Sequence, residues 1–182
     1  MVIIPEFKTA DAGVAMRGVR LAAVAVRRGP PDVQDPALNS HSKLNCVLAC
    51  VAAAKAGADE ALMLDQRGFV ATCNSTNFFV VRGGVVETPA EGPLMPGITR
   101  RNILDLCAAR GLPAAERADL TLAQVYAADE AFVTGSFGGV VPVVEVDGRR
   151  IGDGKRGPVT ARLQALYEEL CAAEAARGRA LA

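Results

Sequence analysis

A glycine directly before a predicted helix start is the sharpest candidate for ligand binding in this chain. In residues 94–100 (LMPGITR), Gly97-Ile98-Thr99 opens a helix that is predicted to run to about Arg110. Backbone N–H groups in the first turn of a helix lack partners and lie at the positive end of the helix dipole, so they suit a phosphate dianion. From these residues alone, the alternative is an ordinary helix N-terminus without a ligand.

Side chains that could act as nucleophiles or bases are scarce. The sequence has one histidine, His41, and four lysines: Lys8, Lys43, Lys55 and Lys155. A single histidine argues against a Ser-His-Asp triad and against a multi-histidine metal site. Cys46 and Cys50 are four residues apart on a predicted helix, but no second pair accompanies them, and we expect no metal site. Chemistry that needs a lysine therefore has few candidates.

The elements that must position these residues are helices separated by runs of short strands. Apolar spacing and turn residues predict helices at 44–56, 97–110 and 122–126 and from Pro158 onward. They predict strands at 19–28, 61–65, 68–72, 78–82, 85–88, 130–134 and 140–146, and a β-like run at 2–4. This order lacks the strict alternation of a parallel sheet and predicts a mixed α/β (α+β) domain.

Four segments together carry a resemblance to a known family. They are GADEALMLDQRGFVATCNSTNFFV at 57–80, LMPGITRRNILDLC at 94–107, ADEAFVTGS at 128–136 and PVVEVDGRRIGDGKRGPVT at 142–160. In this order and spacing they closely resemble the class IV aminotransferases, of the branched-chain and D-amino-acid kind, from about Val19 to Leu170. The resemblance implies the large domain of a fold-type IV enzyme, a mostly antiparallel β pseudo-barrel flanked by helices, with pyridoxal 5'-phosphate as cofactor.

The resemblance also implies which residues hold this cofactor. Ile98 and Thr99, after Gly97, match the pair that binds its phosphate, and Met95 would press on the face of its ring. Thr134-Gly135-Ser136 matches a turn whose last hydroxyl also reaches the phosphate; serine stands here where threonine is usual, and either can donate the hydrogen bond. Asn77 matches a family asparagine.

Two positions depart from the family pattern. The family's Schiff-base lysine precedes the helix at 44–56, and an alignment without gaps puts it on Asn39, one helical turn before Lys43. We nevertheless assign Lys43 as the catalytic lysine, because residues four apart share a helix face. The family glutamate that keeps the pyridine nitrogen protonated is replaced by Thr72, which cannot supply that charge. This departure leaves room for chemistry other than ordinary transamination.

The resemblance covers only part of a typical family member. A smaller N-terminal domain, which closes over the substrate in the family, has no counterpart in residues 1–28. We therefore expect a linker remnant at 1–18, the cofactor-binding large domain at 19–171 and a fraying tail at 172–182. Family resemblance further implies a homodimer that acts on amino acids and 2-oxo acids.

Composition narrows the remaining classes. The formal net charge is zero and aromatic residues are 4%, which argues against nucleic-acid binding. No apolar run approaches the roughly 20 residues of a membrane-spanning helix. The five cysteines are odd in number and irregularly spaced, as expected for reduced thiols in a cytoplasmic protein. Arg27-Arg28 is interpreted as a solvated edge.

Three functions fit these observations. The leading hypothesis is transamination of amino acids with Lys43 as Schiff base. A lyase resembling aminodeoxychorismate lyase shares the implied fold and cofactor. The third is a truncated or inactive homologue that catalyses nothing.

Overall fold

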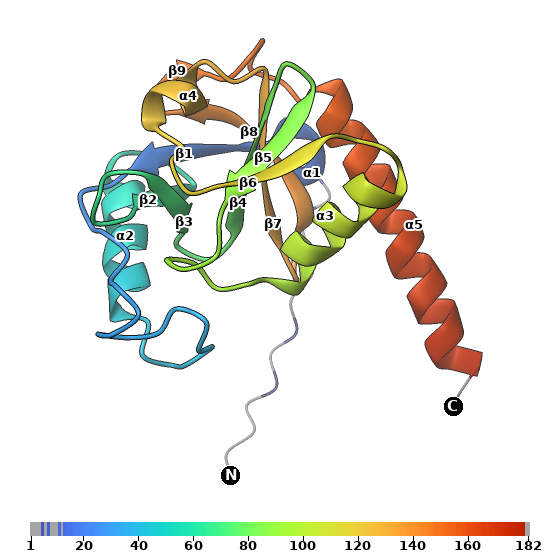
Figure 1. Cartoon of the computed structure of the whole chain (residues 1–182), viewed down its shortest axis with the longest axis horizontal. Coiled ribbons are helices and arrows are strands. Elements are labelled where there is room, and N and C mark those ends of the chain that lie inside the picture. Colours follow the sequence, from blue (N-terminus) through green and yellow to red (C-terminus); the bar gives the residue numbers. More distant parts are fainter. Residues whose placement is uncertain (1–4, 6, 8–10, 12, 181–182) are drawn as a thin grey trace.

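A single curved sheet flanked by helices forms the body of the protein (Figure 1). The computed structural model describes residues 5, 7, 11 and 13–180. The predicted β-like run at 2–4 lies outside these residues. The strands are β1 (Val19–Ala23), β2 (Glu60–Leu64), β3 (Val70–Cys73), β4 (Asn77–Arg82), β5 (Val85–Pro89), β6 (Ala114–Arg117), β7 (Glu130–Gly135), β8 (Gly139–Val146) and β9 (Arg149–Arg150).

The sheet is mostly antiparallel, as expected for the predicted fold class. Its strand order is β3-β2-β1-β8-β7-β4-β5-β6, with β9 paired to β8. The pairs β1–β2, β1–β8 and β5–β6 are parallel, and the other recorded pairs are antiparallel. The sheet curls enough for β3 to contact β4 and β5, although they are far apart in the strand order. The result is a half-barrel.

Helices flank the sheet. They are α1 (Val14–Arg17), α2 (Leu44–Lys55), α3 (Ile98–Ala109), α4 (Leu122–Tyr126) and α5 (Pro158–Ala180). α2 packs on β1 and β2, whereas α3 and α5 pack on each other and on β7 (Figure 1). Stacked rings of Phe79 and Phe132, with centroids 4.7 Å apart, lie in the core beneath α3 and α5.

Several boundaries differ from the sequence prediction. The strand expected at 19–28 ends at Ala23, although Val24 N and Arg28 N still donate to Leu62 O and Leu64 O. α5 continues as far as Ala180, through most of the tail expected at 172–182. The short elements α1, β6 and β9 were not predicted, since each is too short to establish an apolar period.

The exposed face of α2 is apolar. Four apolar residues at helical spacing, Leu44, Val47, Leu48 and Val51, are between 47% and 69% exposed. The helix packs on the sheet through Ala49 and Ala53, which are 0% and 1% exposed. Small side chains let the helix approach the strands closely, so the larger apolar residues point away.

Candidate functional site

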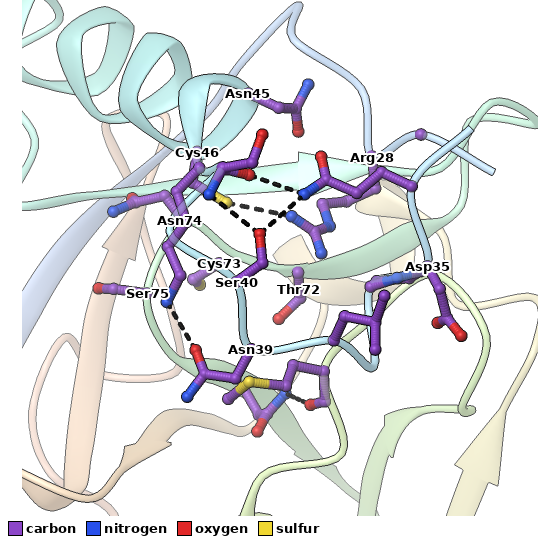
Figure 2. A pocket seen from close by; sticks show the side chains of 18 of the residues that line it. Arg28, Asp35, Asn39, Ser40, Asn45, Cys46, Thr72, Cys73, Asn74 and Ser75 are labelled. Carbon is purple, nitrogen blue, oxygen red and sulfur yellow. Dashed lines mark hydrogen bonds between the residues drawn. The ribbon is translucent and has the colours of Figure 1, made fainter. Parts of the chain in front are cut away.

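A cavity of about 220 Å³ lies between the start of α2 and the end of β3 (Figure 2). Its walls come from the loop at 29–43, the turn at 72–77 and Met95. Lys43, Thr72, Asn77 and Met95, all predicted from sequence, line this one cavity. Residues from three separate parts of the sequence therefore converge here.

Lys43 is the N-cap residue of α2, and its side chain is exposed. Its Nζ donates a hydrogen bond to Asn39 Oδ1 at 3.0 Å. The expectation that these residues are one helical turn apart is wrong, because the helix begins only at Leu44. The preceding loop brings them together instead. That loop is held by Gln34 Nε2, which donates to Ser42 O at 2.8 Å, and by Ser42 N, which donates to Ser40 Oγ at 2.9 Å.

Thr72 is 5% exposed, and its hydroxyl already has a partner. Thr72 Oγ1 donates to Thr76 O at 2.9 Å. The buried carboxylate of Glu60 stabilises the turn between them. It accepts hydrogen bonds from Ser75 N, Ser75 Oγ and Thr76 Oγ1 at 2.8–2.9 Å. Burial, and then the charge of Glu60, raise the pKa of the adjacent Cys73 thiol well above its usual value.

Asn77 links the cavity to the start of α3. Its Nδ2 donates to Met95 O at 3.0 Å. A Cβ atom at Gly97 would collide with Asn77 Oδ1, so the close approach of this loop to β4 requires glycine at 97. Asn77 therefore sets where the first turn of α3 lies.

The N-terminus of α3 lacks a side-chain cap, unlike two other helices of the described chain. Thr121 and Gln124 form a capping box on α4, and Glu130 accepts from Val159 N and Thr160 N at the start of α5. At α3 the N-cap residue is Gly97, and no side chain of the described residues accepts a hydrogen bond from the N–H groups of the first turn. Its N–H groups are thus free to bind an anion.

The other residues predicted for the phosphate lie beside the cavity rather than in its wall. Ile98 is 76% exposed, and Thr99 is buried with its Oγ1 3.3 Å from Tyr167 OH. Gly135 ends β7, where a Cβ would come within 3.3 Å of Thr76 Cγ2, and Ser136 follows it on the surface. Asn77 thus contacts the loop before α3, and Thr76 contacts the end of β7, so the turn at 72–77 lies between the cavity and both of these places.

Arg28 and Cys46 also line the cavity, and neither was predicted as a site residue. Arg28 was interpreted from sequence as solvated, but its Nη1 donates to Cys46 Sγ at 3.1 Å (Figure 2). Its Nε donates to Pro93 O at 3.0 Å. Only the path of the loop at 29–43 puts Arg28 there, and we find no sequence signal that indicates it.

The arrangement joins one primary amine to a free helix N-terminus and several hydroxyl groups. This donor set fits a small molecule that carries both an aldehyde and a phosphate. Within residues 5, 7, 11 and 13–180, no cluster of three or more His, Cys, Asp or Glu side chains could hold a metal ion. In the same part of the chain, no helix combines the length and apolar character needed to cross a membrane.

Comparison with known proteins gives consistent matches. Residues 2–146 match the family model of amino-transferase class IV. A putative branched-chain-amino-acid aminotransferase of Methanocaldococcus jannaschii is 41% identical over 154 residues, which cover 84% of this chain and 53% of the relative. The branched-chain-amino-acid aminotransferase of Pseudomonas aeruginosa is 46% identical over 134 residues, or 74% of this chain and 43% of the relative.

Solved structures of aminotransferases are similar to this chain in fold. The branched-chain aminotransferase from Thermoproteus uzoniensis with norvaline has a TM-score of 0.81 at 34% identity, covering 87% of this chain and 53% of that one. An aminotransferase from Brucella abortus bound to PLP has a TM-score of 0.79 at 31% identity, covering 92% and 56%. The chain spans about half the length of the relatives it matches.

Proposed function

Because the chain belongs to the amino-transferase class IV family, we propose that it binds pyridoxal phosphate and takes part in the transfer of amino groups between amino acids and 2-oxo acids. The family and the fold-type IV large domain predicted from sequence are both confirmed. The observation that carries the proposal is the Lys43 amine in the wall of a cavity shared with Thr72, Asn77 and Met95.

When bound, pyridoxal phosphate supplies an aldehyde that takes up an amino group and a ring that accepts electrons. Lys43 is assigned two roles. Its Nζ would attach the cofactor covalently, and it would accept and return the proton that moves during amino-group transfer. Asn39 Oδ1, at 3.0 Å, holds this amine at the cavity. The loop contacts made by Gln34 and Ser40 support this geometry by fixing the loop that carries Asn39.

The phosphate is assigned to the start of α3. The N–H groups of Ile98 and Thr99 would bind it there, and Ser136 would add a hydroxyl. The uncapped N-terminus of α3 supports this assignment. Asn77 positions the site through Met95 O and Gly97, and the Met95 side chain would lie against the ring.

Thr72 is assigned to the side of the ring nitrogen. Its hydroxyl hydrogen is committed to Thr76 O, so it can offer a lone pair but no negative charge. A neutral neighbour stabilises a protonated ring nitrogen less than a carboxylate does. We therefore expect slower amino-group transfer than in relatives that have a glutamate at this position.

The substrate is proposed from the relatives. The two named above by sequence are branched-chain-amino-acid aminotransferases, which favours a branched-chain amino acid as donor over a D-amino acid. No observation in the site favours a lyase of the aminodeoxychorismate type. A reducing, cytoplasmic location accords with the five cysteines, which are free thiols in the structure.

The decisive test is covalent trapping. The purified chain is mixed with pyridoxal phosphate, the visible absorbance of lysine-bound cofactor is recorded, and borohydride reduction is followed by peptide mapping. We expect a single label on Lys43. Absence of the band and of the label would instead identify the chain, by itself, as an inactive relative.

We also propose a homodimer. The uncharged stripe of Leu44, Val47, Leu48 and Val51 on α2 supports a self-complementary contact, because a two-fold axis would place the same apolar patch on both copies. Val47→Asp should convert the dimer to monomer in sedimentation equilibrium. Ala165→Asp, on the exposed side of α5, should leave the dimer intact; a monomer already in the unsubstituted protein would refute the proposal.

A further inference from the structure

Thr134 carries a buried hydroxyl group without a partner. The residue is 2% exposed, and its Oγ1 has no hydrogen-bond partner among the residues that the structure describes. Thr88 is equally buried, but its Oγ1 donates to Phe78 O at 2.8 Å. Buried hydroxyl groups are normally satisfied, because an unpaired one destabilises the fold. The fold therefore leaves the Thr134 hydroxyl without a partner among the described residues.

The direction of this side chain follows from the sheet. Successive side chains of a strand point to opposite faces. On β7, Val133 packs in the core on one face, and Phe132 stacks on Phe79 on the face that α3 and α5 cover. Thr134, two residues after Phe132, lies on that second face, directly opposite Asn77 of β4.

Asn77 places the hydroxyl next to the start of α3. Its side chain bonds to Met95 O and touches the space at Gly97, immediately before the helix. Side chains of directly opposed residues lie about 5 Å apart at Cβ, so Thr134 is a neighbour of the same turn. Two independent features thus meet here: the uncapped N-terminus of a 12-residue helix and a buried hydroxyl without a partner.

We propose that the Thr134 hydroxyl donates a hydrogen bond to a phosphate oxygen bound at the N-terminus of α3. Thr134 would then be a phosphate ligand in addition to Ile98, Thr99 and Ser136. The inference rests on the proposed function in naming the cofactor phosphate as the ligand. A free phosphate ion would present the same oxygens, so the test includes both.

The test uses Thr134→Val, which replaces the hydroxyl by a methyl group of similar shape. Binding of pyridoxal phosphate, pyridoxal and inorganic phosphate is measured by calorimetry. Loss of one charge-assisted hydrogen bond should weaken pyridoxal phosphate binding by about tenfold to hundredfold and leave pyridoxal binding unchanged. The ligand-free variant should melt at the same or a higher temperature, because it no longer buries an unpaired hydroxyl. Thr134→Ser should restore the affinity.

Thr88→Val is the matched control. It removes the donor to Phe78 O, so it should lower the melting temperature. The preference of the protein for pyridoxal phosphate over pyridoxal should stay unchanged. Equal affinity of the unsubstituted protein and Thr134→Val for pyridoxal phosphate would overturn the inference while leaving the proposed function intact. A lower melting temperature of ligand-free Thr134→Val would also overturn it, because the hydroxyl would then serve the fold.

The two proposals fail differently. If the unsubstituted protein binds inorganic phosphate but not pyridoxal phosphate, the proposed function fails. Thr134 then remains a phosphate ligand only if Thr134→Val weakens binding of the free ion. If the unsubstituted protein binds neither compound, both proposals are wrong.

Discussion

The amine of Lys43 lies 3.0 Å from the side-chain oxygen of Asn39. The resemblance to the family predicts the lysine at Asn39, so the residue at the predicted position contacts the residue that carries the amine. The contact forms through the loop before α2, since the helix starts at Leu44. A shift of the lysine along the sequence therefore does not remove the amine from this cavity.

Lys43→Arg should abolish the visible band with pyridoxal phosphate and the borohydride label. Arginine keeps the positive charge and a donor for Asn39, but its guanidinium stays protonated and does not condense with an aldehyde. Absorbance and peptide mass spectrometry give the readout. Lys55→Arg, at the far end of the same helix, should behave as the unsubstituted protein. A label that persists in Lys43→Arg would assign the attachment to another lysine.

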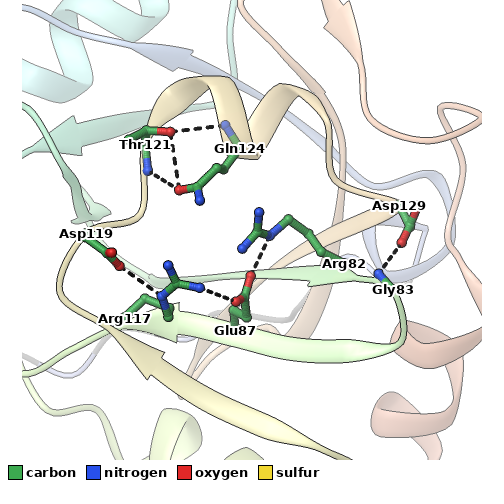
Figure 3. Close-up of polar contacts among 8 residues, drawn as sticks. All are labelled: Arg82, Gly83, Glu87, Arg117, Asp119, Thr121, Gln124 and Asp129. Carbon is green, nitrogen blue, oxygen red and sulfur yellow. Dashed lines mark hydrogen bonds and ion pairs between the residues drawn. The ribbon is translucent and has the colours of Figure 1, made fainter.

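Glu87 should make stability depend on acid pH. Its buried carboxylate bonds to Arg82 and Arg117 across β4, β5 and β6 (Figure 3). The hydrogen bond from Arg82 is the main cause that holds the pKa of the Glu87 carboxyl below its usual value, with Arg117 adding to it. A lowered folded-state pKa stabilises the fold above the unfolded-state pKa, and this stabilisation is lost as the pH falls.

Glu87→Gln should therefore lower the free energy of unfolding by about 1–3 kcal/mol at pH 7. The difference from the unsubstituted protein should shrink as the pH falls below about 4.3, the usual pKa of glutamate. Urea unfolding across this pH range measures it. A difference that stays constant down to pH values near 2 would show that the charge of Glu87 is not the cause.

Glu130 should be needed to anchor α5. Its carboxylate is buried and accepts from Val159 N, Thr160 N and Thr160 Oγ1 at 2.7–2.9 Å. Glu130→Ala leaves these donors unpaired at a helix N-terminus and should lower the free energy of unfolding by about 2–4 kcal/mol. Glu168→Ala, exposed on α5, should change it by less than about 0.5 kcal/mol. If Glu130→Ala lowered the free energy of unfolding as little as Glu168→Ala does, the cap would not stabilise the protein.

The five thiols should divide into two groups. Cys50 and Cys171 are exposed and Cys46 is half-buried, whereas Cys73 and Cys107 are buried. Burial raises the pKa of the Cys107 thiol to about 11 and that of Cys73 well above its usual value. We expect a maleimide at neutral pH to label the first three quickly and the last two only after unfolding. Rapid labelling of Cys73 in the native protein, located by peptide mapping, would contradict this burial.

Local pattern was enough to predict most elements. The helices starting at Leu44, Ile98 and Pro158 and the short helix α4 begin where apolar spacing and turn residues indicate. Glycine next to a helix start indicated the candidate phosphate site, because free N–H groups are a property of any helix N-terminus. β6 was missed because its four residues, AAER, are too few and too polar to show a strand period.

Tertiary structure decided what these elements face. The sequence of α2 shows an apolar stripe, but only packing reveals that Ala49 and Ala53 meet the sheet and that the stripe is exposed. Arg28 enters the cavity, and Thr134 lies opposite Asn77, through contacts between residues far apart in the chain. The sequence by itself therefore determined the family, the order of elements and the candidate residues. Long-range neighbours depend on strand pairing and loop path, which bring together residues that are far apart in the sequence.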